Sequence, residues 1–181
     1  MVEVLELKKR YARLYKPTAS TPVILDVPSF RFLMIDGLGD VGGQDFQAAM
    51  GALYGLAYPV KFSAKKQLGL SYPVMPSEGL YWDAEEGPGS QPTGPAAAAW
   101  RLMIMLPDEV SREFVDEVRA KVIAKKGLPR LEDIRVQTFS EGESIQILHV
   151  GPYADETPTV NRLFSFAAGH DYEVTGSHHE I

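Results

Sequence analysis

The stretch Arg31-Phe-Leu-Met-Ile-Asp-Gly-Leu-Gly-Asp-Val-Gly42 decides how this chain folds. Residues 31–36 form a short, nearly continuous apolar run, which is typical of a β-strand buried on both faces. The glycines after it predict a turn, and from Gln44 to Ala57 apolar residues recur at helical spacing. Pro59 is expected to end that helix. The stretch therefore predicts one strand–turn–helix unit.

The same unit recurs near the C-terminus. A strand at residues 144–150 precedes Gly151, and Thr157-Pro158 predicts the start of a helix. Five residues of the first unit align without gaps on five of the second: Gly37, Phe46, Ala49, Met50 and Leu53 on Gly151, Val160, Leu163, Phe164 and Ala167. Each unit is followed by a strand carrying a glutamate, Glu78 or Glu180. The repeat predicts an α+β fold of two duplicated strand–helix–strand–strand modules, related by a pseudo-twofold axis with a ligand cleft between them.

The other elements complete this plan. An amphipathic helix is expected at residues 4–15, strands at 75–82, 98–106 and 134–139, and a helix capped by Asp108 and stopped by Gly127. The domain prediction is a helical extension (1–20) before a single domain (21–181), with halves at about 21–107 and 130–181 and a connecting helix at 108–127. The Gly/Pro-rich segment 87–95 is either a solvated loop or a flap over the cleft.

Composition excludes several classes of protein. The chain has 181 residues, enough for one sizeable core, and a net charge of −6, which disfavours direct binding to nucleic acid. It has no cysteine, so disulfides and sulfur-based zinc sites are excluded. The charged N-terminal residues fit neither a signal peptide nor a membrane span. A cytoplasmic protein without membrane attachment is expected.

Each of two motifs can be interpreted either as a functional site or as a purely structural feature. Gly37-Leu-Gly39-Asp-Val-Gly42 matches a dinucleotide-binding fingerprint, but Asp40 lies where a pyrophosphate needs positive potential, which favours a plain turn. His178-His179-Glu180 suggests a metal, yet adjacent side chains on a strand point to opposite faces. We therefore predict neither a metal nor a cofactor.

An aromatic and acidic set is more informative. Besides the strand glutamates Glu78 and Glu180, it contains Tyr54, Tyr58, Tyr81, Trp82, Trp100 and Tyr153. Any one aromatic is more often a core residue than part of a ligand site, but several converging near a carboxylate would suit a flat, positively charged molecule. Burial without a protein cation is expected to raise the pKa of such a carboxyl.

The order of segments resembles the GyrI-like small-molecule-binding domains, which also serve as effector-binding domains of multidrug-responsive transcription regulators. The matching stretches are Leu14-Tyr-Lys-Pro17, Val27-Pro-Ser-Phe-Arg-Phe-Leu-Met-Ile-Asp-Gly-Leu-Gly-Asp40, Ala52-Leu-Tyr-Gly-Leu-Ala-Tyr58, Pro76-Ser-Glu-Gly-Leu-Tyr-Trp82, Trp100-Arg-Leu-Met-Ile-Met-Leu-Pro-Asp108, His149-Val-Gly-Pro-Tyr153 and His178-His-Glu-Ile181. The resemblance implies the duplicated fold and a cleft with Glu180 at its base. It assigns Trp82, Trp100, Tyr54, Tyr153 and Glu78 to the cleft wall. Only a short helix precedes the domain, which suggests the stand-alone form without a helix-turn-helix module.

Two functions follow from this resemblance. The first is binding or sensing of a lipophilic aromatic, often cationic, small molecule, with aromatic side chains stacking on it and Glu180 offsetting its charge. The alternative is a hydrolase that opens strained cyclopropanoid natural products, because other stand-alone members resemble such enzymes. Glu180 would then act on water and Tyr153 on a substrate oxygen. A module that binds a partner protein is a third possibility.

Overall fold

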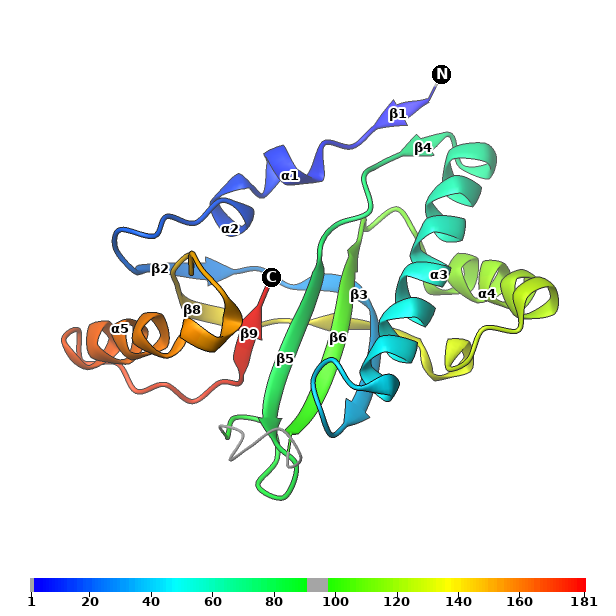
Figure 1. Ribbon diagram of the computed structural model, residues 1–181. Coiled ribbons are helices and arrows are strands. Elements are labelled where there is room, and N and C mark those ends of the chain that lie inside the picture. Colours follow the sequence, from blue (N-terminus) through cyan, green and yellow to red (C-terminus); the bar gives the residue numbers. More distant parts are fainter. Residues whose placement is uncertain (1, 91–97) are drawn as a thin grey trace.

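The computed structural model describes residues 2–90 and 98–181 and shows a mixed α+β fold with largely antiparallel sheets (Figure 1). The strands are β1 (Glu3–Val4), β2 (Val23–Val27), β3 (Phe30–Leu38), β4 (Leu70–Ser71), β5 (Ser77–Asp83), β6 (Ala98–Leu106), β7 (Arg135–Phe139), β8 (Gly142–Gln146) and β9 (His178–Glu180). The α-helices are α1 (Leu7–Arg10), α2 (Ala12–Tyr15), α3 (Gln44–Gln67), α4 (Arg112–Lys126) and α5 (Thr157–Ala168), with short 3-10 helices η2 (Leu131–Asp133) and η3 (Tyr153–Asp155).

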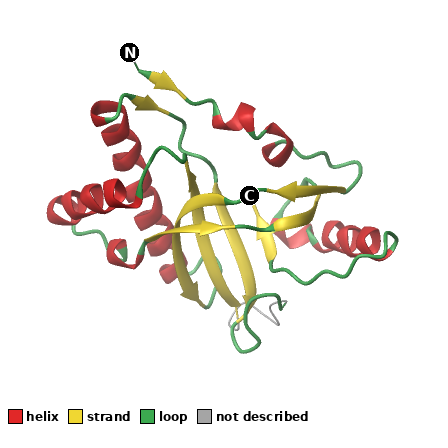
Figure 2. Ribbon diagram, turned by 180° about the vertical axis from the view of Figure 1, so that it is seen from behind, coloured by secondary structure: helices red, strands yellow, loops and turns green. Residues whose placement is uncertain are grey.

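The main sheet has the order β7-β3-β6-β5-β9, and β2 and β8 form a separate pair. The β2–β8 ladder continues the β3–β7 ladder in the same register. Val27 pairs with Gly142 and Phe30 with Phe139, so β2–β3 and β7–β8 are two long strands in constant register, both interrupted by two unpaired residues. Seen from behind, α3 and α4 lie to the left of the strands and α5 lies to their right (Figure 2). The predicted duplicated architecture is confirmed.

The glycine-rich segment after β3 is a turn. Gly39 and Gly42 have φ of 89° and 92°, values that favour glycine. Because β3 is antiparallel to both of its neighbours, it is not the first strand of a parallel dinucleotide-binding sheet. The structural interpretation of this motif is therefore the correct one.

Helix α3 runs from Gln44 to Gln67, so the prediction that Pro59 ends it is wrong. Proline removes one amide donor from a helix. Leu56, Val60 and Ala64 are fully buried on either side of Pro59. Packing of this apolar stripe outweighs the lost hydrogen bond, since most helical stability in proteins comes from tertiary contacts.

Two other boundaries differ from the prediction. Residues 4–15 form the end of β1, which pairs with β4, and the short helices α1 and α2, rather than one helix. Helix α4 is capped by Ser111, whose side chain accepts a hydrogen bond from the Phe114 amide, rather than by Asp108. It ends at Gly127 with φ of 52°, as predicted.

The register of β5 with β9 determines which side chains share a face of the main sheet. Gly79 pairs with Glu180 and Tyr81 with His178, so these side chains share one face of the sheet. Trp100 pairs with Tyr81 on that face, and its ring packs against Phe46 of α3. We call this the helix face and the other the reverse face. In the described part of the chain, no helix is both long and apolar enough to cross a bilayer.

Candidate functional site

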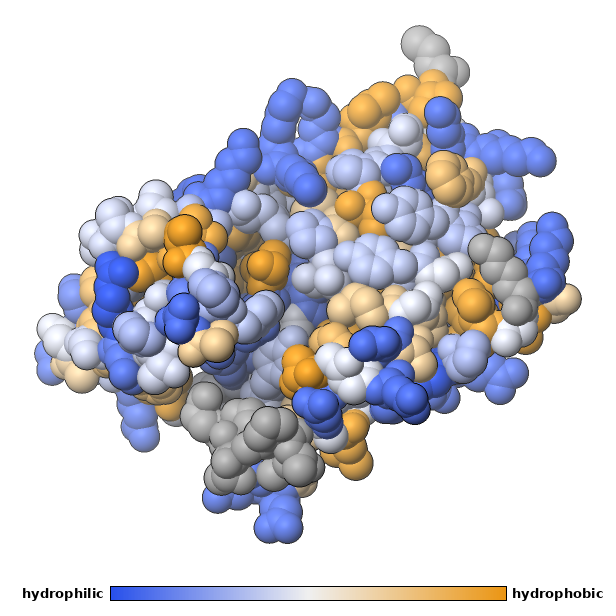
Figure 3. Space-filling model, viewed as in Figure 1, coloured by the Kyte–Doolittle hydropathy of each residue, from blue (hydrophilic) through white to orange (hydrophobic). Residues whose placement is uncertain are grey.

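A cavity of about 560 Å³ lies between β8, β9, α5 and the N-terminal α2. Figure 3 shows the surface hollowed between the part of the molecule that carries α5 and the part that carries α3. Apolar side chains make up much of the cavity wall. Six glutamates line it as well, Glu78, Glu141, Glu143, Glu156, Glu173 and Glu180, and no arginine or lysine is among its described lining residues. Such a cavity is apolar and acidic together.

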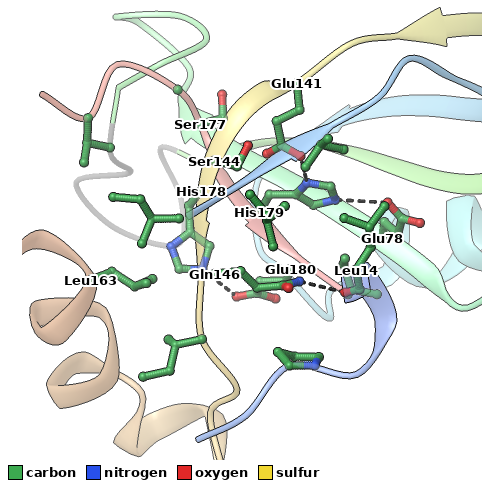
Figure 4. A pocket seen from close by; sticks show the side chains of 18 of the residues that line it. Leu14, Glu78, Glu141, Ser144, Gln146, Leu163, Ser177, His178, His179 and Glu180 are labelled. Atoms are coloured by element: carbon green, nitrogen blue, oxygen red, sulfur yellow. Dashed lines mark hydrogen bonds and ion pairs between the residues drawn. The ribbon is translucent and has the colours of Figure 1, made fainter. Parts of the chain in front are cut away.

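The cavity reaches both faces of the sheet. His178 and Glu180 point to the helix face and His179 to the reverse face, because successive side chains alternate along a strand. All three residues line the cavity (Figure 4). The cavity therefore passes around the edge of β9 that faces away from β5, with a group of polar residues at each end.

The cleft cluster at the helix-face end is centred on Glu180. The Tyr153 hydroxyl donates a hydrogen bond to Glu180 Oε2 at 2.7 Å, and His178 Nε2 lies 3.3 Å from Glu180 Oε1. The Tyr81 hydroxyl also bonds this carboxylate. Glu156, just before α5, lies close to His178 and Glu180. The cleft cluster thus consists of Tyr81, Tyr153, Glu156, His178 and Glu180.

The pKa of Glu180 is lowered, against the expectation from sequence. Burial acts to raise it, but hydrogen bonds from His178, Tyr153 and Tyr81 outweigh burial. The hydrogen bond to Glu180 in turn raises the pKa of His178. The expectation was wrong because it considered burial without the three donors. Glu180 is consequently ionised at neutral pH.

The reverse-face cluster consists of Tyr15, Glu78, Glu141 and His179. His179 Nε2 lies 3.1 Å from Glu78 Oε2 and its Nδ1 2.9 Å from Glu141 Oε2. The Tyr15 hydroxyl donates to Glu78 Oε1 at 2.6 Å. Burial lowers the pKa of His179, but hydrogen bonds to the two carboxylates raise it to about 9. Glu78 thus belongs to a buried ionic network that joins β5, β9 and α2.

The predicted site residues fall into three groups. Glu180, Tyr153 and Glu78 line the cavity, and Tyr81 contacts Glu180. Tyr54 and Tyr58 lie on α3 with ring centroids 6.2 Å apart, outside the cavity lining. The tryptophans lie elsewhere: Trp100 is fully buried in the core, and Trp82 lines a separate hollow beside Asp36.

Five residues of the two clusters were missed as site residues from the sequence, namely Tyr15, Glu141, Glu156, His178 and His179. The i, i+2 spacing of His178 and Glu180 was the available signal, because it places both on one strand face. Glu156 joins them only through the fold. One ligand atom from each of Glu156, His178 and Glu180 lies within 4.8 Å of the others, so these three could hold a metal ion. The absence of a metal stays a prediction.

The predicted flap at 87–95 is only partly described. Residues 84–90 form turns, in which the Gly89 amide donates to the Ser177 hydroxyl at 3.1 Å. Residues 91–95 lie outside the described part of the chain. Gly89 and Ser177 connect the described part of this loop to the segment before β9.

Comparison with known proteins agrees with the geometry. The family model of the GyrI-like small molecule binding domain matches residues 20–181. An uncharacterized conserved protein from Listeria innocua is 29% identical with a TM-score of 0.85, covering 97% of this chain and 88% of that one. Two hydrolases from the same organism are 28% and 27% identical, with TM-scores of 0.82 and 0.85. They cover 97% and 98% of this chain and 91% and 88% of theirs. Curated proteins give no match.

Proposed function

Because this chain belongs to the GyrI-like small-molecule-binding domains, we propose that it binds a lipophilic organic cation at the Glu180 end of the cavity. One observation carries the proposal: apolar side chains and six glutamates line the cavity, without an arginine or lysine among the described lining residues. An organic cation with an apolar body is complementary to both properties.

The cleft cluster supplies the charge for this interaction. Glu180 is ionised, because its lowered pKa keeps the proton off at neutral pH. It is also partly desolvated, with a side chain 21% exposed, so its attraction for a cation is stronger than that of a surface carboxylate. Glu156 adds a second negative charge nearby.

Apolar contacts come from the opposite wall. Val160, Leu163 and Phe164 of α5 line the cavity, and Phe164 is 41% exposed. Tyr153 adds an aromatic ring beside Glu180 and is 72% exposed. Burying such surface against a ligand contributes about 25 cal/mol for each Å² of apolar area. An aromatic, lipophilic body is therefore favoured over a small polar cation.

Calorimetric titration with a lipophilic aromatic monocation tests the proposal, with a neutral molecule of the same shape as its comparison ligand. Intrinsic fluorescence is a poor readout, because neither tryptophan lines the cavity. We expect the cation to bind about tenfold more tightly than its neutral counterpart. Glu180→Gln should remove that preference, and Glu117→Gln on the surface of α4 should keep it. Equal affinity for both ligands in the unaltered protein would overturn the proposal.

Hydrolysis is the second candidate, favoured by the contact of Tyr153 with Glu180 beside His178 and by two similar structures being described as hydrolases. In this case Glu180 accepts a proton from water while Tyr153 donates to a substrate oxygen. The lowered pKa of Glu180 makes it a weak base, so the structure favours binding. Mass spectrometry after incubation with a strained cyclopropanoid tests turnover, and full recovery of intact compound counts against it.

Location and partners remain proposals. We propose the cytoplasm as its location, since the sequence has no cysteine. The net charge of −6 argues against a direct nucleic-acid partner. Gel-shift titration with duplex DNA at low salt would reveal such binding if it occurred.

A further inference from the structure

Two members of the cleft cluster, Tyr153 and Glu156, lie on the short segment between His149 and α5. We call this segment, residues 150–156, the connector. Residues 150–155 are all exposed, so packing in the core does not hold the connector in place. Its described backbone hydrogen bonds run within it or into the first turn of α5. Such local bonds shape the connector but do not fix its position relative to β9.

His149 bonds to the connector and to the helix that follows it. Its Nε2 lies 3.1 Å from the Pro152 carbonyl oxygen, and its Nδ1 lies 2.9 Å from Thr159 Oγ1 in the first turn of α5. Because a carbonyl oxygen only accepts, Nε2 is the nitrogen that carries the proton. In the neutral ring Nδ1 then accepts from the Thr159 hydroxyl. One side chain thus joins the connector to the start of α5.

The backbone turns back over this ring at Gly151. Its φ of 144° favours glycine. A Cβ atom at this position would lie 3.5 Å from His149 Nε2, so the backbone runs in van der Waals contact with the ring. The turn brings the carbonyl of Pro152, three residues after His149, within hydrogen-bond distance of the imidazole.

The first half has a bond at the equivalent helix position. Thr159 aligns with Asp45 at the same offset as the other residues of the repeat. Arg130 Nη1 donates to Asp45 Oδ2 at 2.8 Å, and its Nη2 donates to the Asp36 carbonyl at 2.6 Å. Arg130 therefore joins the end of β3 to the first turn of α3. The turn that it holds carries no residue of the cleft cluster, whereas the bonds of His149 act on a segment that carries two.

We propose that His149 is a positioning residue of the cleft cluster, which holds the connector where Tyr153 reaches Glu180 and where Glu156 lies beside both. Groups of a binding site keep their geometry when the residues around them lock their positions. The described hydrogen bonds of the His149 ring go only to the connector and α5, so this residue acts through them. Its effect on ligand affinity rests on the proposed function, but its effect on the connector does not.

Hydrogen–deuterium exchange followed by NMR on the full chain tests the position of the connector without a ligand. His149→Phe keeps a ring and removes both hydrogen bonds. We expect the amides of Asp155 and Glu156 to exchange about tenfold faster in this variant, because the connector opens more often. His170→Phe makes the same change at an exposed histidine whose ring bonds the Phe166 carbonyl, and it should leave these two amides unchanged.

A second pair of variants changes only the side chain of Thr159. Thr159→Val removes the hydroxyl at nearly constant shape and should also speed exchange, whereas Thr159→Ser keeps the hydroxyl and should behave like the unaltered protein. Calorimetry should find the affinity for the aromatic cation lowered about fivefold in His149→Phe and Thr159→Val. In a Tyr153→Phe/Glu156→Gln background, which already lacks both groups, His149→Phe should cause no further loss.

Two results would overturn the proposal. The first is unchanged exchange of the connector amides in both His149→Phe and Thr159→Val. The second is an equal loss of affinity in Thr159→Val and Thr159→Ser, because the bond to His149 would then not be its cause. Faster exchange in His149→Phe, in a chain that binds no cation, would support the positioning role and contradict the proposed function alone.

Discussion

The two ends of the cavity contain the same chemical groups in different surroundings. The reverse-face cluster has two glutamates, one histidine and one tyrosine, and the cleft cluster has these and a second tyrosine. Glu78 is 3% exposed and contacts both His179 and Tyr15. The Glu180 side chain is 21% exposed beside its partners His178 and Tyr153. The two carboxylates therefore differ in depth, and Glu180 has Tyr81 as a third donor.

This difference decides what each cluster does. At the reverse face the charged side chains contact one another. Their hydrogen bonds join β5, β9, α2 and the turn between β7 and β8. At the helix face Glu156 and Glu180 also share one histidine, but all three residues are only partly buried, so a ligand can reach the remaining negative charge. We infer that one cluster is structural and the other functional, and the following predictions test that separation.

Removal of a carboxylate should have the largest effect at the reverse face. Glu78→Ala leaves Tyr15 without its acceptor and His179 with one partner fewer, so the free energy of unfolding should fall by about 3–5 kcal/mol. Glu156→Ala in the cleft cluster should change it by about 0.5 kcal/mol or less. Urea denaturation measures both. Similar losses in the two variants would contradict the comparison.

Stability should depend on pH through His179. Its folded-state pKa of about 9 exceeds the ordinary value of 6.5, so its stabilisation is fully present below pH 6.5 and is lost as pH rises through 9. We expect a loss of roughly 3 kcal/mol over that range. The matched variant His179→Gln should show a flatter profile in thermal or urea unfolding. An unchanged slope would rule out this histidine as the origin.

Ligand affinity should depend on pH through His178. This histidine lies near Glu180, Glu156, Tyr81 and His179, and its raised pKa reflects the bond to Glu180. When protonated, His178 competes with a cation for the carboxylate. Affinity for a permanent cation should therefore rise about threefold to tenfold between pH 6 and 8. In His178→Gln calorimetry should find little change, and a fall in affinity with pH would contradict the model of competition.

The smallest effect is expected for Tyr153→Phe. The change removes one of three donors to Glu180, and the hydroxyl lies on an exposed side chain. Cation affinity should change by about twofold and the free energy of unfolding by less than about 0.5 kcal/mol. Titration and urea denaturation of the same sample provide both values. A loss of several kcal/mol in stability would show that the cleft cluster is structural too.

Much of the fold could be predicted because local signals were strong. The repeat from Gly37 and Gly151 revealed the duplication, and the apolar run of residues 98–106 matched β6. The path of α3 through Pro59 could not be predicted, because the burial of Val60 and Ala64 depends on distant strands. Sequence patterns alone do not predict a helix boundary that depends on tertiary contacts.

The site was predicted only in part for the same reason. Glu180 and Tyr153 do line one cavity. The sequence gives no sign that Trp100 is sealed in the core, where its ring lies against the backbone of Gly37. Nor does it show that Gly79, rather than Glu78, lies opposite Glu180 in the β5–β9 ladder. A one-residue difference in register moves a side chain to the other face of the sheet.

The pairing of Gly79 with Glu180 shows what one polypeptide allows that a symmetric dimer does not. In a dimer of identical modules, a residue on the axis of the central strand pair faces its own copy, so a glutamate there would face a second glutamate and the two would repel each other. In this single polypeptide the residue opposite Glu180 is a glycine, over which the Tyr81 ring lies. Covalent duplication thereby allows a binding centre that is chemically one-sided on a scaffold that is geometrically two-fold.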